Sequence, residues 1–177
     1  WFIDILGSVA ETMITNNYAD HIYTLSKGIS WITFQNECAA IRIDDQLCKQ
    51  GKGITLYSSF KQNLKGDKIY TVFEDSEGDE WILTNKGISI IGKKQVDSDF
   101  PFQYIKEADG IIYLVSQSDK LASYNFKTRQ FKFIEIPYHV SMINEVKKFD
   151  SNTLLLATDN GLIIYKIKEK EFQLIDI

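Results

Sequence analysis

The residues of this 177-residue chain that come closest to a metal-binding motif are four acidic side chains in one short stretch: Asp75, Glu77, Asp79 and Glu80. Carboxylates at this spacing occur in calcium loops, but the helix–loop–helix type also needs a Glu at its twelfth position. Counted from Asp75, that position is Lys86. Asp, Ser and Gly favour turns, so we expect a solvated hairpin turn here and no bound metal.

Catalysis has few candidate residues. The chain contains two histidines, His21 and His139, and a zinc site or a Ser-His-Asp triad would need one of them beside suitable partners. Neither lies in a recognisable local signature. His139 follows Pro137 and Tyr138 in an expected link between two repeated units, which predicts an exposed side chain. We therefore expect no catalytic residue, no metal and no cofactor.

The two cysteines, Cys38 and Cys48, could pair in an oxidising compartment. A tight turn near Asp44 would pair position 43 with 46, which puts Cys48 out of register with Cys38 by about three residues at ~3.3 Å each. That offset exceeds the reach of a disulfide. We expect two free thiols.

The elements that would position these side chains come from an internal repeat. Residues 124–136 align without a gap on residues 165–177, with one Tyr, one Lys, one Phe and two Ile identical. A self-match at a period of about 40 residues, with strand-like content, is typical of β-propeller blades. No segment offers a sustained helical stripe of apolar residues. The sequence predicts an all-β fold made of β-propeller blades, each with four antiparallel strands.

Further copies of the unit lie upstream. Thr84 and Gly87 occupy the slots of Thr158 and Gly161, with two turn-forming residues between them. An aromatic residue recurs in the expected second strand and should be core. Those aromatics are Trp31, Trp81 and Tyr113. The repeat divides the chain into expected units at 20–66, 67–101, 102–136 and 137–177, with a partial unit at 1–19. About four units of roughly 40 residues fit in the chain.

Composition excludes some classes of function. The net charge is -4 and 44% of the residues are hydrophobic. The basic residues are almost all Lys, with Arg42 and Arg129 the only arginines, which gives no electrostatic case for binding nucleic acid. No apolar run reaches the roughly 18 residues that a membrane helix needs.

Residues 69–88, Ile-Tyr-Thr-Val-Phe-Glu-Asp-Ser-Glu-Gly-Asp-Glu-Trp-Ile-Leu-Thr-Asn-Lys-Gly-Ile, resemble the regulator-propeller repeat. In that family the repeat forms the periplasmic sensor region of hybrid two-component regulators from gut Bacteroidetes. The resemblance implies a non-enzymatic sensor module that binds a nutrient ligand, such as an oligosaccharide, and relays a conformational signal to a kinase. It also implies a periplasmic location, a parent protein with a membrane helix, and a homodimer. Propellers of that family have about seven blades, so the resemblance implies that the four units of this chain form an open arc of a larger propeller.

Two alternatives stay open: a propeller used as a protein-interaction scaffold, and a glycan-cleaving enzyme. The 75–81 stretch is also similar to the Asp-box of sialidase-type propellers, but Ser76 stands where the Asp is expected. Sialidases clamp the substrate carboxylate with three arginines, and this chain has two.

A ligand should bind on the face where the links between units meet the turns between second and third strands, because polar loop residues converge there. The alternative is that these polar residues only form turns and bind no ligand. The candidate ligand-binding residues are Asn36, Asn85, Lys86, Asp119, Tyr138, His139 and Asn160.

Overall fold

The computed structural model describes residues 18–34, 40–57, 64–66, 68–92, 96, 98–125, 128 and 130–175. These residues form four antiparallel sheets in chain order. The first sheet contains β1 (Ala19–Thr24), β2 (Ile29–Phe34), β3 (Ala40–Asp44) and β4 (Ile54–Tyr57). The second contains β5 (Ile69–Glu74), β6 (Glu80–Thr84) and β7 (Gly87–Ile91).

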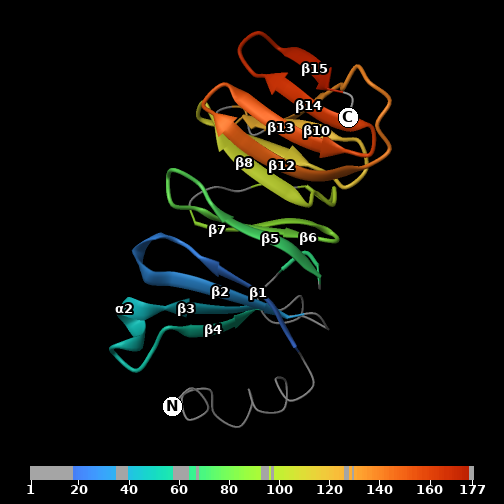
Figure 1. Cartoon of the computed structure of the whole chain (residues 1–177). Helices are drawn as coiled ribbons and strands as arrows, with labels where there is room; N and C mark the ends of the chain where they lie inside the picture. Colours follow the sequence, from blue (N-terminus) through green and yellow to red (C-terminus); the bar gives the residue numbers. More distant parts are fainter. Residues whose placement is uncertain are drawn as a thin grey trace.

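The third sheet contains β8 (Tyr104–Ala108), β9 (Ile111–Val115), β10 (Leu121–Asn125) and β11 (Gln130–Ile134). The fourth contains β12 (Ile143–Asp150), β13 (Thr153–Thr158), β14 (Gly161–Lys166) and β15 (Glu171–Ile175). Each sheet follows the meander order of a propeller blade, and the blades stack face to face (Figure 1). The all-β, blade-forming prediction is confirmed.

The second sheet has three strands within the described residues, where four were expected. Beyond β7 the chain passes close to the free edge of that strand, because the backbone N–H of Ile88 donates to the carbonyl of Ser98 at 3.1 Å. A Cβ built on Gly87 would lie 2.0 Å from the same carbonyl oxygen. The absence of a side chain at Gly87 is what allows this close approach.

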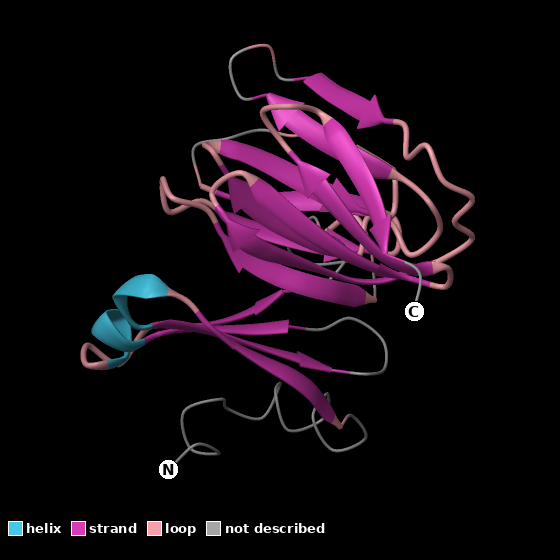
Figure 2. Ribbon diagram, turned by 45° about the horizontal axis from the view of Figure 1, so that its top comes forward, coloured by secondary structure: helices cyan, strands magenta, loops and turns pink. Residues whose placement is uncertain are grey.

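The predicted tight turn after β3 is wrong. Ile43 pairs with Ile54, not with position 46, and a short helix α2 (Asp45–Cys48) lies between the strands (Figure 2). The helical turn forms because the carboxylate of Asp44 accepts from the backbone N–H groups of Gln46 at 3.0 Å and Leu47 at 3.1 Å, the bonds of an N-cap. Cys48 is a free thiol, while Cys38 lies outside the described residues.

The recurring aromatics are core residues, as predicted. Trp31 and Trp81 are fully buried and Tyr113 nearly so. Each packs into a different apolar cluster: Trp31 with Val72 across the first and second sheets, Trp81 across the second and third, and Tyr113 across the third and fourth. One repeat position therefore supplies the central side chain of every interface between blades.

The prediction of a solvated acidic turn is wrong for three of its four carboxylates, while Glu77 is exposed. Asp75, Asp79 and Glu80 are at most 5% exposed. The carboxylate of Asp75 accepts from the backbone N–H groups of Glu77 and Asp79 and from the indole Nε1 of Trp81 at 2.8 Å. Burial is possible because these donors replace water around the charge. The turn is a structural element of the blade.

The arc is open, as expected. Strands β1 and β15 belong to different sheets. Ile22 corresponds to Val72 in the repeat, since Tyr23 pairs with Trp31 as Phe73 pairs with Trp81. Val72 packs against the first sheet and is 6% exposed, whereas Ile22 is 70% exposed. The first sheet therefore leaves uncovered a position that is buried between blades in the second.

Within the described residues, no helix has the length and apolar character needed to cross a membrane.

Candidate functional site

The turns between second and third strands contact the links between blades, as expected for one shared face. The backbone N–H of Asn85 donates to the carbonyl of Lys68 at 3.0 Å. Two blades further on, the side-chain amide of Asn160 donates to the carbonyl of His139 at 3.1 Å. These contacts fix the links to the sheets, so Asn85 and Asn160 have structural roles on this face.

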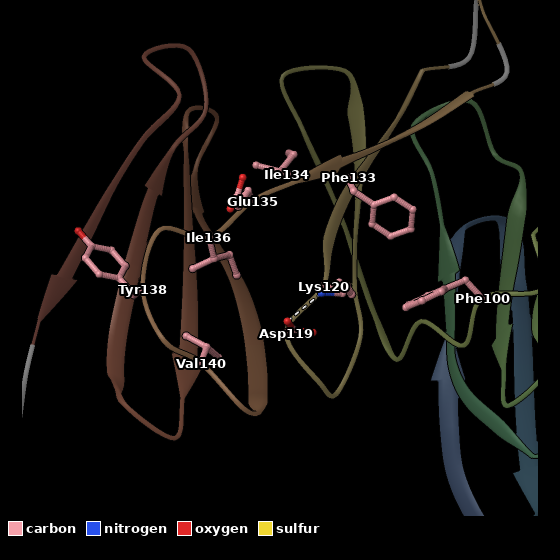
Figure 3. Close-up of a pocket in the computed structure, with 9 residues that line it drawn as sticks. All are labelled: Phe100, Asp119, Lys120, Phe133, Ile134, Glu135, Ile136, Tyr138 and Val140. Carbon is pink, nitrogen blue, oxygen red and sulfur yellow. Dashed lines mark hydrogen bonds and ion pairs between the residues drawn. The ribbon is translucent and has the colours of Figure 1, made fainter.

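The same face carries a groove of about 600 Å³, within the range of small-molecule sites. Its wall includes the end of β11 and the link that leads from β11 to β12. Figure 3 shows Phe100 and Phe133 on one side of the groove and Tyr138 and Val140 on the other. The groove is lined by Phe100, Asp119, Lys120, Phe133, Ile134, Glu135, Ile136, Tyr138 and Val140.

The middle of the groove is formed by the turn between β9 and β10. Val115 pairs with Leu121, so this turn contains residues 116–120. Ser116 closes it, because its hydroxyl accepts from the backbone N–H of Lys120 at 3.0 Å and its backbone N–H donates to the carbonyl of Lys120 at 2.9 Å. The closed turn holds Asp119 and Lys120 in the groove.

Asp119 and Lys120 form an ion pair, with 2.8 Å between Oδ2 and Nζ. Both side chains are about half exposed. The hydrogen bond from Lys120 holds the pKa of Asp119 below its usual value. The pair thus offers a donor and an acceptor at one point of the groove, with no net charge.

The aromatic side of the groove is a stack of three Phe rings. Phe133 is 53% exposed and meets Phe100 edge-to-face, with 5.6 Å between ring centroids. Phe100 packs in turn on the buried Phe102, with 4.7 Å between centroids. Because its neighbours fix the ring of Phe133, this side chain presents an apolar surface without a further cost of ordering.

The opposite side is a link that is held by its own hydrogen bonds. The hydroxyl of Tyr138 donates to the carbonyl of Phe172 in β15 at 3.0 Å. The carboxylate of Asp159 accepts from the backbone N–H groups of Met142 at 3.2 Å and Ser141 at 3.1 Å. The bond from Met142, followed by that from Ser141, lowers the pKa of Asp159. The link is therefore a fixed wall of the groove.

Two of the predicted ligand-binding residues, Asp119 and Tyr138, line the groove. His139 is exposed beside it in the link, Lys86 is exposed on the β6–β7 turn two blades from Asn160, and Asn36 lies outside the described residues. Whether any of them binds a ligand stays a prediction.

Sequence reasoning misses Phe133 and Glu135. The alternation of Phe131 and Phe133 is that of a buried strand, and Phe133 aligns with the half-buried Leu174. The available signal is position: Phe133 lies on β11, the outermost strand of its sheet, which has one neighbouring strand. An outermost strand gives its side chains less cover than a central one.

The groove offers aromatic surface, two carboxylates, an ammonium group and the hydroxyl of Tyr138. Within the described part of the chain, no group of three His, Cys, Asp or Glu side chains is placed to hold a metal ion. The arrangement is suited to binding an organic ligand through stacking and hydrogen bonds.

No protein-family model matches this chain, and no curated protein matches its sequence. Solved structures match its fold. The extracellular domain assigned to the hybrid two component system BT3049 from B. thetaiotaomicron is 22% identical, with a TM-score of 0.66, and the match covers 93% of this chain and 22% of that one.

Virginiamycin B lyase from Staphylococcus aureus is 19% identical with a TM-score of 0.67, covering 92% of this chain and 56% of the lyase. An auxiliary nutrient binding protein from Bacteroides thetaiotaomicron is 13% identical with a TM-score of 0.60, covering 88% of this chain and 40% of that one. The chain thus spans about half of the lyase and under a quarter of the ectodomain. It has the β-propeller fold that extracellular domains of hybrid two-component systems also have.

Proposed function

We propose that this chain is a non-enzymatic part of the periplasmic sensor region of a hybrid two-component regulator. In this proposal the groove binds a nutrient ligand, an oligosaccharide, and the bound state is relayed to a kinase in the parent protein. The parent would be anchored by a membrane helix and act as a homodimer. The observation that carries the proposal is a pre-formed groove with an exposed aromatic ring and a hydrogen-bonding ion pair, on a fold shared with sensor ectodomains.

The groove has the properties that saccharide binding requires. A sugar ring has an apolar C–H face and a rim of hydroxyls that both donate and accept hydrogen bonds. Phe133 offers apolar surface, while Asp119 accepts and Lys120 donates. Because the walls are held by Tyr138 and by the aromatic stack, binding loses little entropy in ordering the site.

The test is calorimetry of the purified chain against a panel of plant and host oligosaccharides. We expect binding of at least one, weakened about tenfold by Asp119→Asn, which removes the charge that holds Lys120 in place. The matched control is Asp99→Asn, since Asp99 forms an exposed pair with Lys65 at 2.9 Å and does not line the groove. Loss of binding in both variants, or in neither, would contradict the assignment of the groove.

Chromatography of the same mixtures distinguishes a sensor from an enzyme. An unchanged oligosaccharide after prolonged incubation is the expected outcome. The virginiamycin B lyase fold match makes this measurement necessary, because a propeller can also carry a catalytic site. Cleavage products that disappear in the Asp119→Asn variant would refute the non-enzymatic proposal.

A protein-interaction scaffold is the second candidate. It is favoured by the exposed Phe149 and Met142, which are 72% and 40% exposed on β12 and just before it. Aromatic residues and Met are enriched at protein interfaces relative to the rest of the surface. Under this alternative, a Phe149→Ala variant would no longer bind a partner protein. Titration of the unmodified chain with saccharides would give no heat.

A further inference from the structure

The lining of the groove has an excess of negative charge. It contains the carboxylates of Asp119 and Glu135 and the ammonium group of Lys120, a net charge of -1. Asp119 and Lys120 neutralise each other at 2.8 Å. Glu135 is exposed and, among the described residues, has no ion-pair or hydrogen-bond partner. The unpaired charge of the groove is therefore the Glu135 carboxylate.

From this charge balance we infer that the groove selects neutral oligosaccharides and rejects anionic ones such as uronic acid oligomers. The inference rests on the proposed function and adds the ligand class. A ligand carboxylate in the groove would lie near Glu135, and the positive charge of Lys120 that could offset the repulsion is already balanced by Asp119. A like charge in an open site weakens binding by about tenfold.

Recognition of a neutral sugar follows from the two walls. The exposed ring of Phe133 is held by Phe100, so a sugar ring can stack on it without displacing another side chain. Glu135 and Ile136 directly follow β11, and neither residue has a hydrogen-bond partner among the described residues. Their backbone N–H and C=O groups are therefore available as donors and acceptors for hydroxyls.

The experiment titrates the chain with paired trisaccharides of glucose, galactose and mannose and their glucuronic, galacturonic and mannuronic counterparts. Each pair differs mainly by the C6 carboxylate. We expect at least one neutral trisaccharide to bind about tenfold tighter than its uronic counterpart. Glu135→Gln should bring the two affinities within about twofold, because it removes the repulsive charge and keeps the size.

Two aromatic variants locate the binding. Phe133→Ala should weaken the affinity for the neutral trisaccharide by about tenfold or more. Phe149→Ala, which removes an even more exposed ring outside the groove, should leave binding unchanged. Each variant is first checked for an unchanged circular dichroism spectrum, so that a folding defect is not mistaken for a binding effect.

The outcomes separate the inference from the proposed function. Equal or tighter binding of the uronic trisaccharide by the unmodified chain would overturn the inference and leave the saccharide sensor intact. The inference would also be overturned, with the saccharide sensor left intact, if the Phe133→Ala variant still bound the neutral trisaccharide and the NMR shifts lay on the first two sheets. If no saccharide of either class binds, both the inference and the oligosaccharide assignment fail.

Discussion

Replacing Arg42 by methionine should destabilise the fold strongly, because it breaks a buried ion pair between the first two blades. Glu80 is 5% exposed and accepts from Arg42 Nη2 at 2.7 Å and Nε at 3.0 Å, and from the indole Nε1 of Trp31 at 2.6 Å. The hydrogen bond to Glu80 is also the main cause that raises the pKa of Arg42. Methionine keeps much of the apolar stem but leaves the carboxylate buried without a counter-ion.

Breaking a buried pair from one side costs about 3–5 kcal/mol. For a chain of this length each kcal/mol lowers the melting temperature by about 2–4 °C, so a drop of at least ~6 °C is expected. Urea unfolding gives the free energy directly. The control is Asp99→Asn, which breaks the exposed Lys65–Asp99 pair and should cost less than about 1 kcal/mol.

A second variant tests the mechanism rather than the size of the effect. Combining Arg42→Met with Glu80→Gln removes both charges, and the amide oxygen can still accept from the indole of Trp31. The double variant should regain most of the lost stability, since the main cost is an unpaired buried charge. A loss below about 1 kcal/mol for Arg42→Met, or a double variant no better than the single one, would refute the reasoning.

Three further predictions concern the turns. Asp75→Ala should lower stability by about 3 kcal/mol, measured by urea unfolding, since it removes bonds to one indole and two backbone amides at about 1 kcal/mol each. Gly87→Ala should cost more than about 3 kcal/mol because the new Cβ meets a backbone carbonyl, whereas Gly51→Ala, with open space around it, should cost only the about 1–2 kcal/mol of a left-handed backbone. The link hydrogen bonds lower the pKa of Asp159, so its contribution is complete above the unfolded pKa of about 4 and is lost as the pH falls through the lower folded value. Asp159→Asn should therefore flatten the acid limb of a stability–pH curve, and an unchanged limb would contradict this.

The blade architecture is predictable from sequence because it is encoded by repetition. Trp31, Trp81 and Tyr113 sit at one position of the unit, and the Thr84–Gly87 and Thr158–Gly161 turns close with a hydrogen bond from the Thr hydroxyl to the Gly carbonyl at 2.8 Å in both cases. Because the pattern recurs along the chain, each copy of the unit supports the assignment of strands in the other copies. This is why strand order and core positions follow from residue spacing alone.

The burial of the acidic turn is not predictable in that way. Glu80 is buried because its partners Trp31 and Arg42 come from the neighbouring blade, 49 and 38 positions earlier in the chain. A local window shows only a charged turn, which in isolation would be solvated. The same limit applies after β3, where one carboxylate cap, from Asp44, turns an expected tight hairpin into a helical turn.

The groove lies where the repeat departs from its own pattern. The turns Asn85–Lys86 and Asp159–Asn160 have two residues between the paired strands, whereas the corresponding turn of the third blade contains residues 116–120. This longer turn supplies Asp119 and Lys120 to the groove. Positions that the repeat holds constant are constrained by stacking one blade on the next, so they are not free to vary with a ligand. Residues beyond the two-residue turn of the second and fourth blades carry no such constraint, which is the physical reason to look for recognition at Asp119 and Lys120 rather than at the turn that those two blades share.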